Sequence, residues 1–283
     1  EGGGIGDGAG DALLAGVARQ RDPATTLDRL LRLLQAVLGR TSYLALLDEQ
    51  PAARERLVEV MARSALLAER LAAHPLLLDD LLDGRADAPP GDRDALVALW
   101  RASAAGLPTD DAEAQLVALN ELRQSVAFRI ARVALLDRQP AVASAAQLAA
   151  LAEVVVDALL GIARADMRRQ HGGLDAAGPH AGVAVVGYGS LGGAELGFGS
   201  DLDLVFLFDP HCEGHSSDGA RPLDAGRYQV RLVQKLLALL ATQTPAGRLY
   251  EADPGRPPGG AQGLLLCSPP RFSSYQATQA RAW

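Results

Sequence analysis

The chain has 283 residues, of which 48% are hydrophobic and 22% charged, and its formal net charge is −7. This composition is that of a soluble globular protein, and the length is sufficient for two medium-sized domains. The acidic balance argues against nucleic acid as the main partner, because proteins that bind its backbone usually concentrate basic residues on one face.

Cysteine and lysine are both scarce. The only cysteines are Cys212 and Cys267, which gives no disulfide framework and no paired metal-ligand spacing. Lys235 is the only lysine. No run approaches the roughly 20 uncharged apolar residues of a membrane-spanning helix, and the sequence from Glu1 lacks the basic and apolar regions of a signal peptide. We therefore expect a cytoplasmic protein without a membrane partner.

Helical periodicity dominates the first part of the chain. From about residue 11 to residue 170, apolar residues recur every three or four positions and no strand-like alternation is present. This pattern predicts an all-helical first domain, residues 1–175. Its longest helices are expected at about residues 110–137 and 144–170.

Two capping-box spacings predict where helices begin. Thr25 is followed three residues later by Asp28, and Ser144 by Gln147. A hydroxyl at the helix start and a polar side chain three residues on can satisfy each other's backbone amides. We therefore expect helices to start at Thr25 and at Ser144.

The pattern changes beyond the helical region. A linker rich in glycine is followed by a β-branched run, Val183–Val186, which predicts a short strand. A Gly-rich turn leads to Leu202–Phe208, which is apolar at nearly every position, as in a strand buried on both faces. A helix at about residues 225–243 and a strand at Arg248–Ala252 follow. The sequence predicts an α+β protein whose second domain, residues 176–283, contains a mixed sheet.

Two aspartates stand at the start of the Leu202–Phe208 segment. Asp201 and Asp203 are two residues apart on an expected strand, so both side chains leave the same face. Carboxylates this close repel each other unless a cation lies between them, and hard oxygen ligands suit Mg²⁺ carrying a nucleotide triphosphate. The alternative is a turn at the strand start in which Ser200 and Asp201 act only as caps.

A glycine-rich loop precedes these aspartates. Gly187, Gly189, Gly192 and Gly193 lack side chains, so their backbone amides could approach phosphate oxygens closely. Glycines here could also form no more than a tight turn. Because the loop leads directly into Asp-x-Asp on an apolar strand, we favour a phosphate-binding role.

The phosphate-binding hypothesis is supported by a resemblance to known proteins. It is carried by the segment VVGYGSLGGAELGFGSDLDLVFLFD, from Val185 to Asp209. Gly189-Ser190, ten intervening residues and then Asp201-Leu202-Asp203 resemble the signature of the DNA polymerase β-like nucleotidyltransferase superfamily. The longer segment resembles the catalytic motif of the glutamine synthetase adenylyltransferase family. LYEAD, from Leu249 to Asp253, is similar to the segment where that family places its third carboxylate.

The resemblance implies a polymerase β-like catalytic core with a nucleotide-binding loop that includes Ser190 and Ser200. In such enzymes three acids, here Asp201, Asp203 and Asp253, hold two Mg²⁺ ions that orient ATP. The implied target is a tyrosine hydroxyl of glutamine synthetase, whose modification by AMP regulates nitrogen metabolism. The PII signal protein is a further implied partner.

Enzymes of this family have two homologous halves, one that attaches AMP and one that removes it by phosphorolysis. RTSYLALLDEQP, from Arg40 to Pro51, and LLAERLAAHPLLLDDLLD, from Leu66 to Asp83, resemble the helical segment ahead of the C-terminal, adenylylating half. The resemblance implies a fragment of that half, truncated before its last core segments and its C-terminal helical domain. The removing half, or a catalytically silent docking fragment, are the alternatives.

The chain departs from the family pattern at two places. Ser190 stands where the family usually has lysine, although serine fits the wider superfamily. After Asp253 the family reads close to Ala-Arg-Leu-Arg-Pro-Ser-Gly, whereas Gly255 and Pro257 occupy the positions of its arginines. Arginine matches phosphate geometry closely, so less positive charge faces a triphosphate here. Pro254 predicts that the preceding strand stops at Asp253.

Weaker signals come from the residues around these motifs. His211, Cys212 and His215 could be zinc ligands, but they lie in a Gly- and Ser-rich stretch without a fourth partner, so we favour an exposed loop. Tyr250 and Glu251 flank the third carboxylate and face away from it by strand alternation. We expect them to serve packing.

Overall fold

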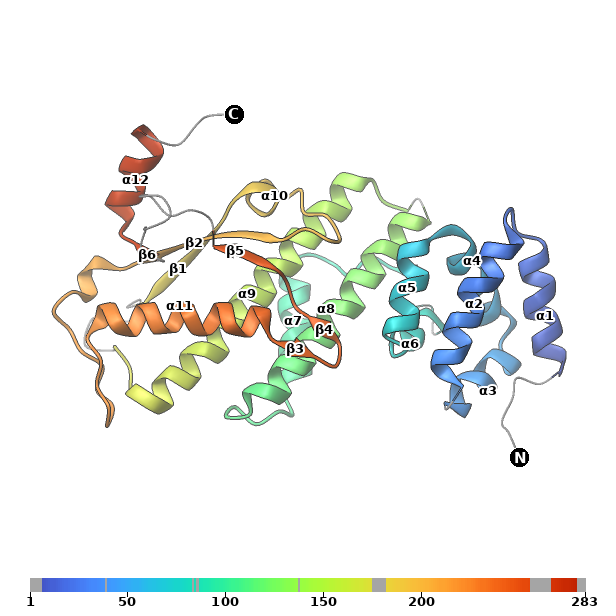
Figure 1. Ribbon diagram of the computed structural model, residues 1–283, viewed down its shortest axis with the longest axis horizontal. Coiled ribbons are helices and arrows are strands. Elements are labelled where there is room, and N and C mark those ends of the chain that lie inside the picture. Colours follow the sequence, from blue (N-terminus) through green and yellow to red (C-terminus); the bar gives the residue numbers. More distant parts are fainter. Residues whose placement is uncertain are drawn as a thin grey trace. The chain divides into compact units, whose positions relative to one another are not determined.

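The computed structural model describes residues 7–38, 40–82, 84, 87–136, 138–174, 182–254 and 266–278, without the side chains of Asp7, Thr41, Asp253, Pro254 and Tyr275. The chain is mostly helical, with a small mixed sheet in its last third (Figure 1), which confirms the predicted α+β class. It divides into two compact units, the first formed by Glu1–Gly91 with Gln124–Ser144 and the second by Asp92–Arg123 with Ala145–Trp283. The expected domain boundary at residue 175 follows a different criterion, the change from helices to sheet, and stays a prediction.

The first unit is helical throughout its described residues. Its helices are α1 (Asp7–Ala18), α2 (Pro23–Val37), α3 (Thr41–Glu49), α4 (Pro51–Arg63), α5 (Ala65–Ala73), α6 (Leu77–Leu82) and the C-terminal part of α8 (Ala112–Leu135). Leucines at helical spacing form its core; Leu30, Leu33 and Leu57 are each at most 2% exposed. Each helix therefore buries one apolar stripe, as its sequence period requires.

The helix starts predicted from capping boxes were wrong by two or three residues. Helix α2 begins at Pro23, and the carboxylate of Asp22 accepts a hydrogen bond from the Thr25 amide at 3.1 Å. Helix α9 (Ala141–His171) begins directly after Pro140, and Ser144 is buried within it. Pro23, at the first position of α2, needs no amide partner. Before α9 the Pro140 carbonyl accepts from the amides of Ala143 and Ser144, so the helix starts ahead of the serine.

The two longest helices confirm the prediction made from helical periodicity. Helix α8 lies within the expected 110–137, and α9 within three residues of the expected 144–170. Helix α9 is also long and apolar enough to cross a membrane by length and composition, but 56% of its apolar window is buried inside the protein. Core helices of soluble proteins meet the same criterion. Helix α7 (Arg93–Ala104) joins α8 and α9 in the second unit.

The sheet of the second unit is mixed. Its path runs β1 (Val183–Gly187), β2 (Leu202–Phe208), β5 (Ala252–Pro254), and β6 (Leu266–Cys267) also pairs with β2. β1 is antiparallel to β2, whereas β5 and β6 are parallel to it. The two predicted strands at β1 and β2 are confirmed, and β2 has the predicted bounds.

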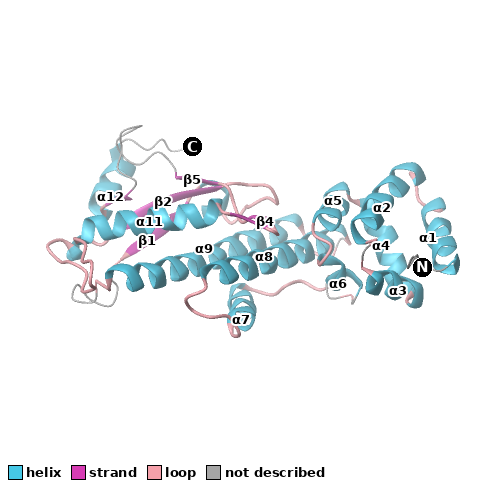
Figure 2. Ribbon diagram, turned by 60° about the horizontal axis from the view of Figure 1, so that its bottom comes forward, coloured by secondary structure: helices cyan, strands magenta, loops and turns pink. Residues whose placement is uncertain are grey.

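The two faces of β2 differ, which corrects the expectation of a strand buried on both. Leu202, Leu204 and Phe206 are at most 1% exposed, while Asp203 and Val205, which alternate with them, are only half-buried. Helices α9 and α11 (Ala225–Ala241) lie along one face of the sheet (Figure 2). Leu204 lines a cavity between the sheet and α9. The Leu204 side is therefore the covered one, and Asp203 belongs to the opposite face.

The strand predicted at Arg248–Ala252 was wrong. The chain instead forms a hairpin, β3 (Gln243–Thr244) with β4 (Gly247–Arg248), and the next strand, β5, begins at Ala252. Gly247 has a φ of 89°, a conformation that favours glycine and turns the chain sharply. The helix predicted at 225–243 is confirmed by α11.

Helices α9 and α11 are joined by charge as well as by apolar packing. The ammonium of Lys235 on α11 forms an ion pair with Asp166 on α9, and Asp166 also accepts from Arg169 at 2.7 Å. Arg164 of α9 donates to the Val183 carbonyl at 3.2 Å, which ties the helix to β1. These bonds keep the helical layer and the sheet in one unit.

Candidate active site

The register of β2 and β5 brings two of the predicted acids to neighbouring backbone positions. Asp203 is the Cα partner of Asp253, and Leu202 is that of Ala252. The Leu202 amide donates to the Glu251 carbonyl at 2.8 Å, just before this pairing begins. The sheet thus places the third predicted carboxylate position directly beside the second.

Asp201 stands one residue before β2 and is exposed. It alternates with the buried Leu202, as Asp203 does, so the strand period assigns both aspartates to the face away from α9. That face is accessible to a solvated ligand. The opposite face carries the buried Leu202, Leu204 and Phe206, so neither aspartate points to it.

Gly189 is the loop glycine on which the carboxylate geometry depends. Its φ is 55°, and a β-carbon at this position would overlap the Asp203 carboxylate. The backbones of the loop and of β2 are also in contact, because the Tyr188 amide donates to the Asp203 carbonyl at 2.9 Å. Only glycine permits both the left-handed conformation and this approach.

Other loop glycines serve close packing of the turn itself. A β-carbon at Gly187 would come within 2.8 Å of the Leu191 side chain, and one at Gly192 within 2.7 Å of the Gly187 carbonyl oxygen. The amides of Gly192 and Gly193 donate to the carbonyls of Tyr188 and Gly189, each at 3.0 Å. This corrects the expectation that all these amides face outward, because a four-residue helix, α10 (Gly189–Gly192), uses them internally.

The amides of Gly189, Ser190 and Leu191 are the donors that remain in the first turn of α10. Within the part of the chain that the structure describes, none of the three makes a hydrogen bond. The Ser190 carbonyl accepts from the Glu195 amide at 2.8 Å, and the Ser200 hydroxyl accepts from the Gly197 amide at 3.1 Å. Ser200 therefore closes the turn before Asp201, as the capping alternative required.

The described side chains do not by themselves complete a metal site. Among them, no group of three or more His, Cys, Asp or Glu residues is arranged to hold a metal ion. The side chain of Asp253, the third predicted ligand, lies outside that set. Two carboxylates beside a third acidic strand position supply the hard oxygen donors that Mg²⁺ prefers, so the donor chemistry fits this ion.

The segment after β2 is not a metal site among its described residues. His211 is exposed and its ring lies 2.9 Å from the Asp209 carboxylate, while Cys212 is only 1% exposed. Burial raises the pKa of the Cys212 thiol. The expected exposed loop is therefore correct for His211 and wrong for Cys212, whose side chain joins the core.

Sequence reasoning missed the partners of Tyr188. Its ring meets that of Phe272 on α12 (Pro269–Thr278) edge to face, with centroids 6.0 Å apart, and its hydroxyl accepts from Gln276 at 2.9 Å. Helix α12 thus holds the residue that precedes Gly189. An aromatic residue between two glycines was the available signal, because it needs a packing partner.

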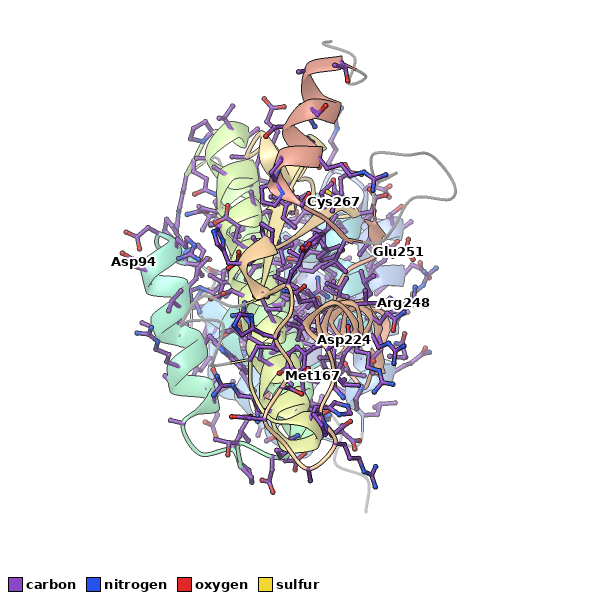
Figure 3. The ribbon with its side chains drawn as sticks, turned by 90° about the vertical axis from the view of Figure 1, so that its left-hand side faces the viewer. Asp94, Met167, Asp224, Arg248, Glu251 and Cys267 are labelled. Carbon is purple, nitrogen blue, oxygen red and sulfur yellow. The ribbon has the colours of Figure 1, made fainter. Side chains whose placement is uncertain are left out.

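Tyr250 serves packing, as predicted, but through a partner that the sequence did not reveal. The Arg123 guanidinium on α8 lies over the Tyr250 ring, 5.2 Å from its centroid, and donates to the Arg248 carbonyl at 3.2 Å. Burial lowers the pKa of Arg123. Glu251 forms an ion pair with Arg248 at 3.2 Å on the surface (Figure 3).

Asn120 completes this support. It is fully buried, and its amide donates to the Thr244 hydroxyl at 2.8 Å and to the Gly247 carbonyl at 2.7 Å. Its side-chain oxygen accepts from Arg123 at 3.1 Å. The hairpin that leads into β5 is therefore fixed by a buried polar pair on α8.

The predicted strand end at Asp253 was wrong by one residue. Pro254 belongs to β5 and is the Cα partner of Leu204. Proline can end a strand where the ladder does not require its amide. Gly255 and Pro257, which stand at the positions of the family's arginines, lie outside the described residues.

Comparison with known proteins gives the family of the sequence. The family model described as Glutamate-ammonia ligase adenylyltransferase matches residues 54–283. Similar proteins include the Bifunctional glutamine synthetase adenylyltransferase/adenylyl-removing enzymes of Xanthomonas axonopodis pv. citri (strain 306), 56% identical, and Stenotrophomonas maltophilia (strain K279a), 52% identical. That of Thioalkalivibrio sulfidiphilus (strain HL-EbGR7) is 38% identical.

In each of these matches the alignment covers 96% of this chain and 28% of the relative. The chain therefore spans less than a third of the length of these curated relatives. By the extent of the family match and the identity to these relatives, the chain belongs to the glutamate-ammonia ligase adenylyltransferase family.

Proposed function

We propose that this chain carries a nucleotidyltransferase site that transfers AMP from ATP to a tyrosine hydroxyl of glutamine synthetase. The observation that carries the proposal is the β2–β5 register, which sets Asp203 beside Asp253 next to a glycine turn. A polymerase β-like core, which the resemblance implied, accounts for acids at adjacent strand positions. Family membership supplies the reaction class, adenylyl transfer.

Asp201, Asp203 and Asp253 would hold Mg²⁺. When bound, Mg²⁺ neutralises the triphosphate and favours departure of pyrophosphate. The missing side chain of Gly189 leaves the Asp203 carboxylate room at its position beside the loop. The acids would otherwise repel one another, so the cation and the acid cluster each stabilise the other.

The loop's own residues would orient the nucleotide. The amides of Gly189 and Ser190 are available as donors to phosphate oxygens, and the Ser190 hydroxyl adds a further donor in place of the family's usual lysine. Tyr188, held by Phe272 and Gln276, keeps the loop in this position. Much of the rate would come from such positioning of ATP and the attacking hydroxyl.

Glutamine synthetase is proposed as the target because the relatives are named for it. The transfer of AMP from ATP to this target would take place in the cytoplasm. The PII signal protein is proposed as a regulatory partner on the resemblance alone. Nucleic acid is not proposed as a partner, because the net charge of −7 disfavours it.

The test compares the chain with its Asp201→Asn and Asp203→Asn variants. We expect both variants to lose Mg²⁺-dependent ATP binding, measured by calorimetry, and incorporation of labelled AMP into purified glutamine synthetase. Asp94→Asn, an exposed acid on α7, is the matched control and should behave as the parent. Unchanged MgATP affinity in both site variants would overturn the assignment.

The removing reaction is distinguished with adenylylated glutamine synthetase and inorganic phosphate. Phosphorolysis releases ADP, whereas attachment of AMP from ATP releases pyrophosphate. Formation of ADP dependent on Asp203 would reassign the site to the removing reaction. ATP binding without either product would favour the docking alternative.

A further inference from the structure

We propose that the first compact unit contains a second ligand site, a cavity that binds the phosphate or carboxylate group of a small anion. The cavity has a volume of about 890 Å³ and lies among α1, α4 and the end of α8. Six arginines line it: Arg19, Arg54, Arg56, Arg63, Arg132 and Arg138. This concentration of positive charge contrasts with the net charge of −7 of the chain.

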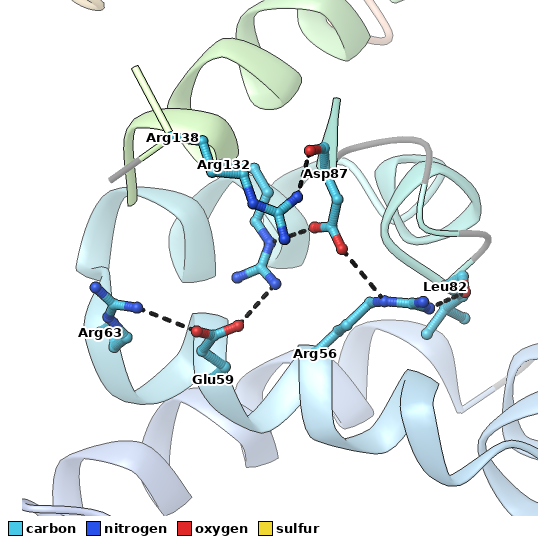
Figure 4. A network of polar contacts seen from close by, with 7 residues as sticks. All are labelled: Arg56, Glu59, Arg63, Leu82, Asp87, Arg132 and Arg138. Carbon is cyan, nitrogen blue, oxygen red and sulfur yellow. Dashed lines mark hydrogen bonds and ion pairs between the residues drawn. The ribbon is translucent and has the colours of Figure 1, made fainter. Parts of the chain in front are cut away.

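Two acids of the lining are already paired with arginines (Figure 4). Glu59 lies 2.7 Å from Arg132 and 3.1 Å from Arg63. Asp87 lies 3.0 Å from Arg132 and 3.6 Å from Arg56. Glu55 is the third acid, so the lining residues that the structure describes carry six positive and three negative side chains. Among these described residues an excess of positive charge remains.

The excess positive charge is on arginines that form no ion pair with the described acids of the cavity. Arg54 donates to the carbonyls of Leu47 and Asp48 at 2.6 and 2.9 Å, and Arg138 donates to the Asp87 carbonyl at 2.5 Å. Arg19 forms no ion pair or hydrogen bond with any described residue. Carbonyls orient a guanidinium without neutralising it, so the charges of Arg54 and Arg138 are fixed in place, and all three charges are still available to an anion.

Arg132 supplies a buried donor that lacks an acceptor. The residue is 1% exposed, its Nε and Nη2 are bound to Asp87 and Glu59, and its Nη1 has no hydrogen-bond partner among the described residues. An unsatisfied buried donor is costly, and more so when it is charged. A ligand oxygen would remove that cost.

The chemistry of the site selects an oxyanion. Guanidinium forks bind carboxylate and phosphate oxygens through parallel hydrogen bonds, and a cavity lined by one sign of charge concentrates ions of the other. The cavity is large enough for a small metabolite with more than one anionic group. We therefore assign it to an anionic effector, independent of the proposed adenylyl-transfer site.

The test is calorimetric titration with sodium pyrophosphate and, separately, sodium citrate, at constant ionic strength and with EDTA present. Arg19→Gln combined with Arg138→Gln removes two exposed arginines of the cavity. We expect the affinity for the better probe to fall at least about tenfold. Arg32→Gln is the matched control, because Arg32 is an exposed arginine of the same unit outside the cavity, and its affinity should be unchanged.

The outcomes separate the sources of binding. Preference for pyrophosphate indicates a phosphate ligand, and preference for citrate a carboxylate ligand; both support the site. Equal affinity in the parent and the double variant, or an equal loss in Arg32→Gln, overturns it, as does failure of both probes to bind. Asp203→Asn should leave the affinity unchanged; because EDTA keeps metal ions away, an increase in affinity on removal of this negative charge would instead locate the anion at the nucleotide loop.

Discussion

The carboxylate of Asp203 occupies the space that a side chain at Gly189 would need. Gly189→Ala should therefore lower the free energy of unfolding, by about 1–2 kcal/mol for the left-handed backbone alone, and should displace Asp203. MgATP affinity should fall with it if the proposed site is correct. Urea denaturation and calorimetry measure the two effects.

Gly199→Ala is the control for this substitution. Gly199 lies in the same loop and lacks a left-handed φ, and a β-carbon added to it would meet no described atom within 4 Å. The stability and affinity of this variant should match those of the parent. Equal effects of the two substitutions would show that loop rigidity, rather than the Asp203 contact, is responsible.

Asn120 should prove more important for stability than its neighbours on α8. Asn120→Leu removes one buried hydrogen bond from each of the Thr244 hydroxyl, the Gly247 carbonyl and Arg123, so we expect a loss of about 2–4 kcal/mol in the free energy of unfolding. Glu121→Ala, exposed on the same helix, should cost little. Comparable urea midpoints for the two variants would contradict this role.

The cap of α2 should give a pH-dependent contribution to stability. Hydrogen bonds from the Thr25 side chain and amide hold the pKa of Asp22 below its usual value. A carboxyl with a lowered folded pKa stabilises the protein above its unfolded-chain pKa, about 3.9, and loses that effect as the pH falls through the folded value. Asp22→Ala should therefore lower the Tm at neutral pH but not at strongly acid pH.

Asp22→Asn is the matched control, because asparagine also caps helices but does not titrate. Its Tm at neutral pH should stay close to that of the parent. A difference between Asp22→Ala and the parent that is the same at all pH values would exclude the charge as the cause.

The departures after Asp253 should lower activity. Gly255→Arg with Pro257→Arg restores the arginines of the family pattern and should raise AMP transfer at least about tenfold in the full-length protein, equivalent to roughly 1.4 kcal/mol. Gly259→Arg adds charge at a position where the family pattern has none and should not. Equal rates at saturating Mg²⁺ before and after the double substitution would show that the departures are tolerated.

Local sequence signals predicted the elements that local interactions decide. The bounds of β2 followed from a run that is apolar at every position but Asp203, and α8 and α9 followed from helical periodicity. The exposed face of β2 was missed because Val205 and Leu207 are apolar whether or not a layer covers them. Burial on that face depends on what the rest of the chain places there.

The hairpin before β5 shows why the remainder could not be predicted. Thr244 and Gly247 are held by Asn120, which lies 124 and 127 residues earlier in the sequence. No short-range pattern identifies such a partner. The candidate site was also predicted only in part. The Asp201–Asp203 spacing can be read from the sequence. The hydrogen bonds of the Gly192 and Gly193 amides within the turn depend on the fold of α10.

The pairing of Lys235 with Asp166 makes the chain's single lysine a chemical reporter. An ammonium held by a carboxylate between α9 and α11 is a poor nucleophile, because acylation needs the free amine and an unobstructed approach. Amine-reactive esters would therefore modify Lys235 faster when its ion pair with Asp166 is broken. The rate of acylation at this one position would record how often this contact between α9 and α11 opens.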